Sequence, residues 1–320
     1  MTYSLSCIFG IFILITVSAN PFGRDIFGRS GGFPKFPLAR RHLQQCGGRL
    51  VSHHAQRSSH RAIAKIVGGT SAPYGAYPWQ VEIQAYRSAS HRFEHHCGGA
   101  VVGERLILTA AHCIANLEYP EKIRLILGKV NLNSRDRHER TYKPEKIVIH
   151  PDFRKDGPHS NDIAMIKVRA TSEGGIHFNS HIQPICLPDM VTQRVATGDW
   201  CTVTGWGAQS QDDLESLSDE LQAASVPVLD QHTCRQSDVY GGRDQSILDS
   251  MVCAGTLAGG VDACGGDSGG PLACQLNGKF VLTGLVSWGD GCAKKNRPGV
   301  YTRVSHFSPW IQETMDKMGL

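Results

Sequence analysis

Ser268 stands in a glycine-rich stretch that could expose a nucleophilic hydroxyl group. Residues 261–271 read VDACGGDSGGP. Glycines allow tight turns in which backbone N–H groups point at a ligand. The N–H groups of Gly266 and Ser268 could hold the negative oxygen of a tetrahedral intermediate, forming an oxyanion hole. Because a lone serine hydroxyl is a weak nucleophile, it needs a base and a group that orients that base.

The chain offers both groups upstream of Ser268. His112 stands in the run TAAHC and Asp162 in the run NDIA. Separations of 50 and 106 residues mean that only the fold can assemble the three side chains. His112 would take the hydroxyl proton and return it to a leaving amine, while Asp162 would hold the imidazole in the correct tautomer. We therefore predict hydrolysis by a Ser-His-Asp triad.

Five further motifs follow one another in a fixed order along the chain. They are Ile66–Gly69 (IVGG), Cys97–Gly99 (CGG), Thr204–Gly207 (TGWG), Ser287–Gly289 (SWG) and Pro298–Tyr301 (PGVY). With the triad they resemble the chymotrypsin-like serine proteases over roughly residues 66–320. Glycine-rich turns of another secreted β-protein would explain one motif but not the ordered set. The resemblance implies an all-β, trypsin-like fold: two six-stranded antiparallel β-barrels, the first ending near residue 185, with the active site between them and a C-terminal helix.

The resemblance also assigns a pocket for the substrate residue before the cleaved bond, P1. Asp262, six residues before the nucleophile, would form its floor, and Gly289 and Gly299 would form walls with room for a long side chain. Ser287 would support the aspartate of the triad. Because an unpaired buried carboxylate is costly, we predict Arg or Lys at P1, with Arg making the bidentate contact. The alternative, a surface-loop aspartate, fits poorly beside a cysteine.

The IVGG motif resembles the mature N-terminus of the family and so implies a zymogen. We predict activation by cleavage between Lys65 and Ile66, after which the Ile66 ammonium would pair with Asp267 and set the oxyanion donors. Because Lys65 would fit the enzyme's own pocket, the activating protease is either another enzyme or the protein itself. The other expected partners are protein substrates with Arg or Lys at P1 and inhibitors of the serpin or Kunitz type.

The sequence has 11 cysteines, of which Cys7 falls in the N-terminal apolar segment. The remaining even number is typical of an oxidising compartment, but sequence alone leaves the connectivity open. The resemblance implies the pairs Cys97–Cys113, Cys201–Cys274, Cys234–Cys253, Cys264–Cys292 and Cys46–Cys186. The last pair would tether the pro-segment after activation, as in processing or cascade proteases. No Cys-x-x-Cys pair occurs, so zinc is excluded on spacing, and we predict no metal and no cofactor.

Residues 1–19 carry no charge, are largely apolar from Leu5 to Val17, and end in the small residues Ser18 and Ala19. This pattern predicts a secretory signal peptide and a secreted, extracellular protein, although the usual positive start is missing. A membrane anchor is the alternative. It is disfavoured because 13 apolar residues are fewer than the roughly 20 that span a bilayer.

Residues 20–65 form a predicted basic pro-segment. Nine Lys or Arg and one Asp give it a net charge of +8. Because the whole chain carries +4, the predicted protease domain, residues 66–320, carries −4. The segment could touch a polyanion, but a solvated linker is the favoured interpretation, and we predict no nucleic-acid partner. Its histidines are expected to be solvated: His42, His53, His54 and His60. No Asn-x-Ser/Thr sequon occurs, so no N-linked glycan is expected.

Short apolar runs between turn residues predict an antiparallel barrel or sandwich. They are residues 80–83, 106–108, 123–127, 146–149, 163–168, 201–204, 279–283 and 300–302. Helical signals are few. Asp230 predicts the start of a short helix, and Pro309 lies just inside the start of a C-terminal helix whose apolar face carries Ile311, Met315 and Met318.

Lys129 marks a departure from the digestive trypsins. In the loop 128–139 it stands where they have the first calcium carboxylate, and an ammonium supplies no oxygen ligand, so we predict little calcium binding.

Two competing function classes are a catalytically dead binding or cofactor relative, which should have lost a triad residue, and a membrane-tethered protease. We also expect His159 and Asp290 to border further subsites.

Overall fold

The computed structural model describes residues 46–55, 69–172, 174–190, 194–210, 213–242 and 246–320. All of them belong to one compact unit, Leu38–Leu320. The predicted signal peptide, most of the predicted pro-segment and the Lys65–Ile66 bond lie outside the described residues.

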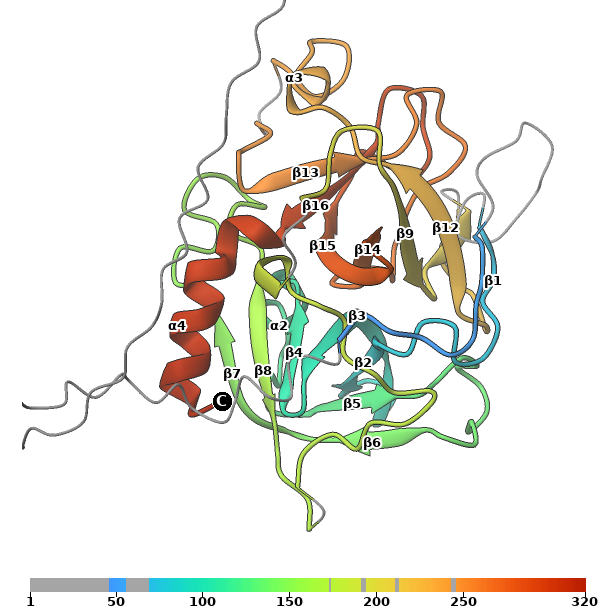
Figure 1. Ribbon diagram of the computed structural model, residues 1–320, viewed down its shortest axis with the longest axis vertical. Coiled ribbons are helices and arrows are strands. Elements are labelled where there is room, and N and C mark those ends of the chain that lie inside the picture. Colours follow the sequence, from blue (N-terminus) through green and yellow to red (C-terminus); the bar gives the residue numbers. More distant parts are fainter. Residues whose placement is uncertain (1–45, 56–68, 173, 191–193, 211–212, 243–245) are drawn as a thin grey trace, which may run out of the picture. The chain divides into compact units, whose positions relative to one another are not determined.

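Two antiparallel, curled sheets form the body of this unit (Figure 1). The first has the order β6-β5-β2-β3-β4-β8-β7. Its strands are β2 (Gln80–Arg87), β3 (Arg92–Gly103), β4 (Leu106–Thr109), β5 (Ile123–Leu127), β6 (Arg140–Tyr142), β7 (Pro144–Ile149) and β8 (Ala164–Val168). Strand β4 is buried at every position and links β3 to β8 in the sheet.

The second sheet has the order β1-β12-β9-β14-β15-β16-β13. Its strands are β1 (Thr70–Ser71), β9 (Trp200–Gly205), β12 (Gln222–Pro227), β13 (Met251–Ala254), β14 (Pro271–Leu276), β15 (Lys279–Trp288) and β16 (Gly299–Arg303). Strands β10 (Ala208–Ser210) and β11 (Asp213–Leu217) form a separate hairpin. The predicted all-β, trypsin-like fold is confirmed, and each predicted barrel corresponds to one curled sheet. Each sheet has seven described strands rather than six, because β1 pairs with β12 and the three-residue β6 pairs with β5.

A shared hydrophobic cluster joins the two sheets. It combines Leu108 of β4 with Leu282 and Leu285 of β15, and it includes the fully buried rings of Trp79 and Trp206. A second cluster fills the interior of the first sheet alone. Because side chains from both sheets bury one another, residues at the facing ends of the sheets are held in fixed positions.

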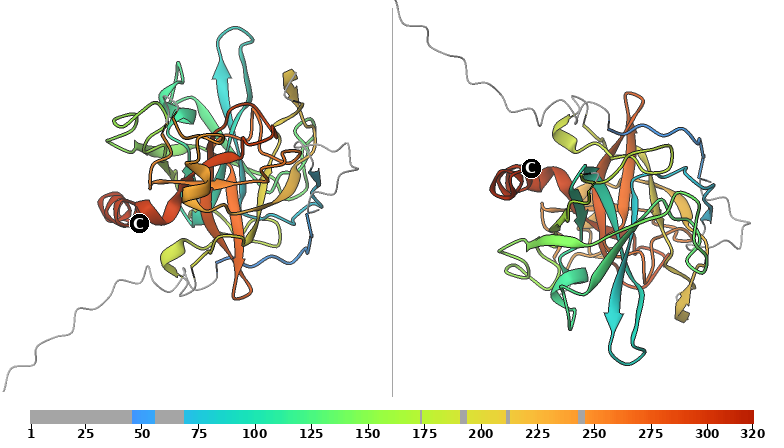
Figure 2. Two further views of the ribbon diagram at one scale, coloured as in Figure 1. Left: turned by 90° about the horizontal axis from the view of Figure 1, so that it is seen from above. Right: turned by 90° about the horizontal axis from the view of Figure 1, so that it is seen from below.

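The helices are short except for the last. They are α2 (His112–Ala115), α3 (Gln231–Cys234) and α4 (Ser308–Met318), with 3₁₀ turns η2 (Pro188–Met190) and η3 (Val304–Phe307). As predicted, Asp230 caps α3, and Pro309 lies just inside the start of α4. Of the predicted apolar face of α4, Ile311 and Met318 are buried and Met315 is half-buried. Helix α4 lies at the side of the strands and leads to the C-terminus (Figure 2). Within the described part of the chain, no helix has the length and apolar character needed to cross a membrane.

The five disulfides implied by the resemblance are all present in the structure. The expectation of a solvated linker is wrong for residues 46–55. Cys46 is buried in its bond to Cys186, and His53 is half-buried because its Nδ1 lies 3.0 Å from the hydroxyl of Tyr77. His54 is exposed, as expected. His42 and His60 lie outside the described residues.

Candidate active site

His112 and Asp162 meet at the edge of the first sheet. His112 begins α2 directly after β4, and Asp162 lies just before β8, the neighbour of β4. Nδ1 of His112 is 2.7 Å from one carboxylate oxygen of Asp162, and the backbone N–H of His112 donates to the other at 2.9 Å. Since a carboxylate only accepts, Nδ1 carries the proton and Nε2 is left as the basic nitrogen.

Two hydrogen bonds from the second sheet hold Asp162. The Ser287 hydroxyl donates to its carboxylate at 2.6 Å, and the Thr302 hydroxyl donates to its backbone carbonyl at 2.7 Å. Asp162 is 1% exposed. Burial alone would raise its pKa, but the bonds and charge from His112 and the bond from Ser287 outweigh burial, so the pKa lies below the ordinary value. Asp162 is therefore ionised at neutral pH.

Ser268 is fixed to the same region through Gly98. The carbonyl of Ser268 accepts from the N–H of Gly98 at 2.7 Å, and the carbonyl of Gly98 accepts from the hydroxyl of Thr109 at 2.8 Å. A Cβ on Gly269, whose φ is +75°, would overlap that same hydroxyl. Thr109 precedes His112 by three residues, so Ser268 and His112 lie on touching segments. The described residues show no Ser268–His112 hydrogen bond; such bonds are often long in free enzymes and tighten with substrate.

The backbone geometry at the predicted oxyanion hole depends on Gly266. Its φ is +94°, and a Cβ there would come within 2.6 Å of Leu217. In the described part of the chain, the N–H groups of Gly266 and Ser268 donate no hydrogen bond, which leaves both available. The carbonyl of Gly266 accepts from Nε2 of His95 at 3.0 Å. No local motif indicates the role of His95, because this contact joins residues far apart in the chain.

Asp267 is completely buried beside this loop. Its carboxylate accepts from the N–H groups of Gly207 at 2.7 Å and Cys264 at 2.9 Å. Burial raises its pKa to about 6, although the hydrogen bonds from Cys264 and Gly207, and then the charge of His95, oppose the rise in part. No salt bridge to Asp267 is formed by the residues that the structure describes. Its predicted partner, Ile66, lies outside them.

The predicted pocket residues line one cavity of about 250 Å³ beside Ser268. Its walls include Asp262, Ser268, Ser287, Gly289 and Gly299, together with Trp288 and Tyr301, whose place in the pocket the sequence motifs did not indicate. A Cβ on Gly299 would lie 2.5 Å from Oδ1 of Asp262, so only glycine leaves the floor open.

Asp262 is 2% exposed, and only one of its two carboxyl oxygens has a hydrogen-bond partner within the described residues. Oδ2 accepts from the N–H of Ala293 at 3.2 Å, whereas Oδ1 and the hydroxyl of Tyr301 find no partner within the described residues. Burial raises the pKa of Asp262 to about 8. The cavity floor therefore offers an acceptor that favours a cationic partner.

His159 and Asp290 have different surroundings. The ring of His159 stacks on Trp288 with centroids 5.3 Å apart and planes 14° apart, so it lies against the cavity wall. Asp290 accepts from Arg297 Nε at 2.9 Å.

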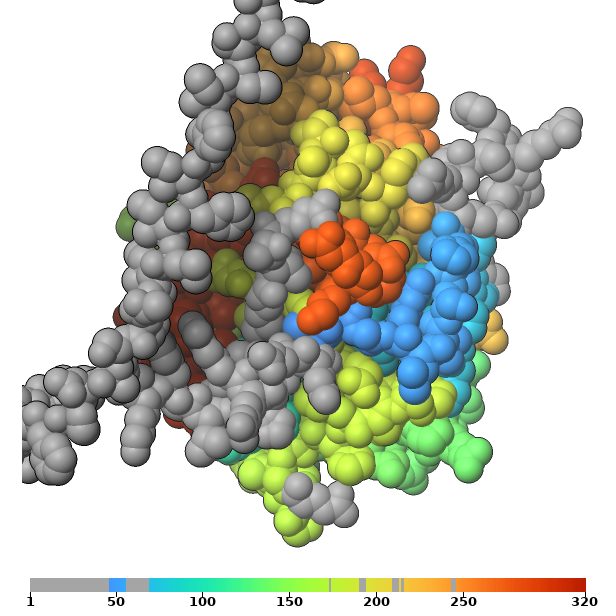
Figure 3. Space-filling model, in the orientation of Figure 1, coloured from blue at the N-terminus to red at the C-terminus, as the bar shows by residue number. Residues whose placement is uncertain are grey.

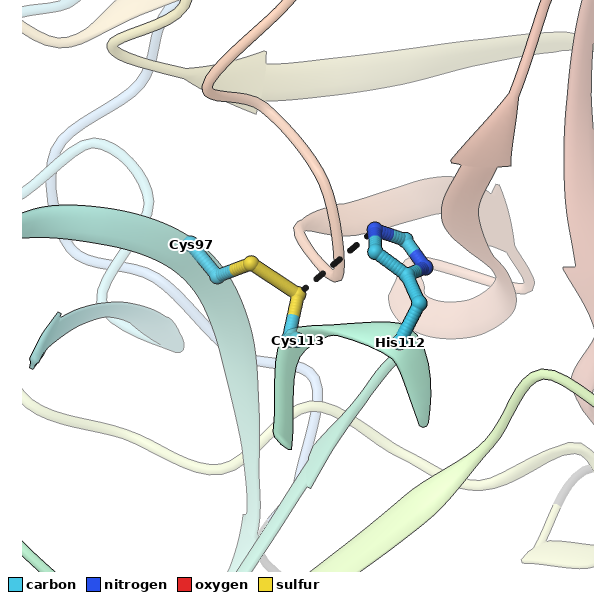
Figure 4. A group of neighbouring side chains, drawn as sticks. All are labelled: Cys97, His112 and Cys113. Carbon is cyan, nitrogen blue, oxygen red and sulfur yellow. Dashed lines mark hydrogen bonds between the residues drawn. A yellow bond between two sulfur atoms is a disulfide. The ribbon is translucent and has the colours of Figure 1, made fainter. Parts of the chain in front are cut away.

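Cys97, His112 and Cys113 form a cluster of potential metal ligands (Figure 4). The two sulfur atoms are joined in a disulfide, and Cys113 Sγ lies 3.9 Å from Nε2 of His112. A disulfide sulfur is not the thiolate that zinc prefers, so the cluster does not fit a metal site. Its role is to tie α2 to β3 beside the base.

Lys129 fills the interior of the loop in which calcium was considered. Its ammonium lies 2.8 Å from Glu139 and donates to the carbonyl of Ser134 at 3.1 Å, with its side chain only 5% exposed. Asp136 accepts from the N–H groups of Val130 and Asn131. The carboxylates of this loop are thus engaged by its own nitrogen atoms.

This fold, with a histidine–aspartate pair beside a glycine-held serine, defines a class of hydrolases. The chain belongs to the trypsin family, whose model, described as Trypsin, matches residues 66–311, and it is a chymotrypsin-like serine protease. It is 38% identical over 257 residues to the urokinase-type plasminogen activator of Gallus gallus. It is 39% identical over 260 residues to the serine proteinase stubble of Drosophila melanogaster. Each match covers 79% of this chain, but only 58% and 31% of those relatives.

Proposed function

We propose that the chain is a secreted serine endopeptidase zymogen that cleaves proteins after Arg or Lys. The observation that carries the specificity is the buried, half-satisfied Asp262 carboxylate in the cavity that Ser268 lines. We assign catalysis to His112, Asp162 and Ser268.

Proton transfer would run through His112. Nε2 takes the proton of the Ser268 hydroxyl as Oγ attacks the carbonyl carbon of the scissile peptide. The oxyanion that forms accepts hydrogen bonds from the N–H groups of Gly266 and Ser268. His112 then protonates the leaving amine, and afterwards activates the water that hydrolyses the acyl-enzyme. Asp162, held ionised by its hydrogen bonds, stabilises the imidazolium in both steps.

Specificity would come from charge and space together. A P1 guanidinium entering the cavity meets Oδ1 of Asp262 and the hydroxyl of Tyr301. Charge-assisted hydrogen bonds of this kind contribute about 1.5–3 kcal/mol each. A neutral P1 side chain would leave the buried acceptor unpaired, which sets the preference for Arg and Lys.

Activation would follow cleavage between Lys65 and Ile66, which frees the Ile66 amine to pair with the buried Asp267 carboxylate. The high pKa of Asp267 in its present surroundings supports the need for a cation there. We assign secretion to the predicted signal peptide. The chicken relative is named for activating plasminogen, which is consistent with a processing or cascade role. The proposed partners also include an activating protease, or the protein itself, and serpin-type or Kunitz-type inhibitors.

Substrate profiling of the cleaved protein tests this proposal. We expect peptide amides with Arg or Lys at P1 to be hydrolysed far faster than those with neutral P1 residues. The Lys65→Gln variant should remain a single chain and stay nearly inactive after trypsin treatment. A Lys65→Gln protein as active as the cleaved wild type would contradict the zymogen mechanism, and a neutral P1 preference would contradict the assignment of Asp262.

A further inference from the structure

Residues 46–55, here called the docked segment, make contacts that a disulfide tether does not require. The N–H of Gly47 donates to the carbonyl of Pro184 at 2.8 Å, and the N–H of Phe280 donates to the carbonyl of Gly47 at 2.9 Å. The φ of Gly47 is +73°, and a Cβ there would lie 2.6 Å from the carbonyl oxygen of Phe280. The segment (blue) lies against orange residues of the β14–β15 region in Figure 3.

Arg49 anchors the middle of the docked segment. Its guanidinium carbon lies 4.5 Å from the ring centre of Phe280 and 5.4 Å from that of Tyr77, distances at which cation–π attraction acts. Its nitrogens donate to the carbonyls of His53 at 2.7 Å and Ala76 at 3.3 Å. Arg49 therefore fixes the segment's own backbone and binds it to the body.

His53 carries this anchoring to the start of the second sheet. Its Nδ1 lies 3.0 Å from the Tyr77 hydroxyl, and its Nε2 lies 3.5 Å from the hydroxyl of Thr70, the first residue of β1. Burial, followed by the charges of Arg49 and His54, lowers the pKa of His53. Burial also raises the pKa of Tyr77. Both groups thus stay neutral from neutral to mildly alkaline pH, and their contact persists.

We propose that the docked segment positions the new N-terminus of the activated enzyme, with Arg49 and His53 as the positioning residues. This inference rests on the proposed cleavage at Lys65–Ile66. Thr70 follows Ile66 by four residues, and four extended residues reach at most about 14 Å. The placement of β1 therefore determines whether the Ile66 ammonium reaches Asp267. Holding β1 in place favours that pairing and hence the active enzyme.

The loss of activity at alkaline pH measures the pairing of the Ile66 ammonium with Asp267. Only the ammonium form pairs, so the midpoint of activity loss lies above the free α-amine pKa of about 7.7–8.0. Tenfold weaker pairing lowers that midpoint by about one pH unit, while activity near pH 7 changes little. The other titratable groups facing Asp267 are His95, with Glu82 beside it, Asp262 and Tyr301. They are unchanged in variants of the docked segment. A purely structural role would lower the melting temperature without moving the midpoint.

The test compares Arg49→Ala and His53→Ala with Leu50→Ala and His54→Ala. Leu50 is 81% exposed and His54 is exposed, so both are matched controls on the same segment. Each protein keeps Cys46–Cys186, is cleaved at Lys65–Ile66, and is assayed with an Arg-P1 amide from about pH 7 to about pH 11. We expect the midpoint to fall by about half to one unit in the two test variants, and in the milder Arg49→Lys variant if Arg49→Ala does not fold.

Midpoints equal to wild type in Arg49→Ala and His53→Ala, or equal shifts in the controls, would overturn the inference while leaving the activation mechanism intact. A wild-type enzyme without a midpoint above the free-amine range would instead overturn the proposed pairing of Ile66 with Asp267. The two failures are therefore distinguishable.

Discussion

Replacing Asp262 with Asn should change activity and stability in opposite directions. The substitution keeps the shape of the side chain and removes the charge. Loss of one partner from a buried ion pair costs about 3–5 kcal/mol, which corresponds to about 10²–10⁴-fold in kcat/KM for an Arg-P1 substrate. A substrate with a neutral P1 residue does not use this charge, so its kcat/KM should change little.

The free enzyme should become more stable. Burial raises the pKa of Asp262 from 3.8 to about 8, so the folded protein holds this proton more tightly than the unfolded chain. Stability from this group is fully present below about pH 4 and is lost as the pH rises towards 8. At about pH 7, which lies about 3 pH units above the ordinary pKa, the loss in the free energy of unfolding is on the order of 4 kcal/mol. Asp262→Asn removes this loss.

Thermal unfolding measures this effect, and the Ser268→Ala background prevents self-digestion. The melting temperature of Asp262→Asn should exceed that of its parent at about pH 7, and the difference should vanish near pH 4. A small amidinium ligand should stabilise the parent much more than the variant. The reasoning is refuted if Asp262→Asn keeps its preference for Arg within tenfold, or if it is no more stable than its parent at neutral pH.

Three further outcomes test the assignments made above. Ser268→Ala should lower kcat by on the order of 10⁶-fold with little change in substrate binding; turnover near the wild-type value would remove Ser268 from the mechanism. After activation, the Cys46–Cys186 bond should keep the product as one band on a gel without reductant and two bands with it, and two bands without reductant would refute the tether. Calcium at millimolar concentration should leave the melting temperature unchanged because Lys129 occupies the loop; a clear rise that EDTA reverses would show that other oxygens bind the ion.

Local sequence predicted the parts of the site that depend on turns. The glycines around Ser268 are required by positive φ angles at Gly266 and Gly269 and by the close approach of Thr109. The caps of α3 and α4 were predictable for the same reason, since each depends on residues within one turn. The disulfide pairing came from resemblance, not from spacing.

Contacts between distant segments could not be predicted. His95 reaches Gly266 across 171 residues, and nothing near either residue indicates that contact. The docking of Arg49 and His53 depends on Tyr77 and Phe280, whose rings are brought together only by the fold. The extra strand in each sheet could not be predicted either. Strand β1 joins a sheet whose other strands begin 130 residues later, at Trp200, and β6 in the first sheet has only three residues.

The two sheets supply different residues to the proposed active site. The proposed base and its orienting carboxylate come from the first sheet, whereas the proposed nucleophile, oxyanion donors and pocket come from the chain that builds the second. Loops of the second sheet can therefore diversify substrate choice while the proton-transfer apparatus stays constant. Neither half would carry the proposed hydrolytic chemistry alone, so a fragment released by partial proteolysis should be inert, and enzymatic activity should report that both halves are intact and correctly joined.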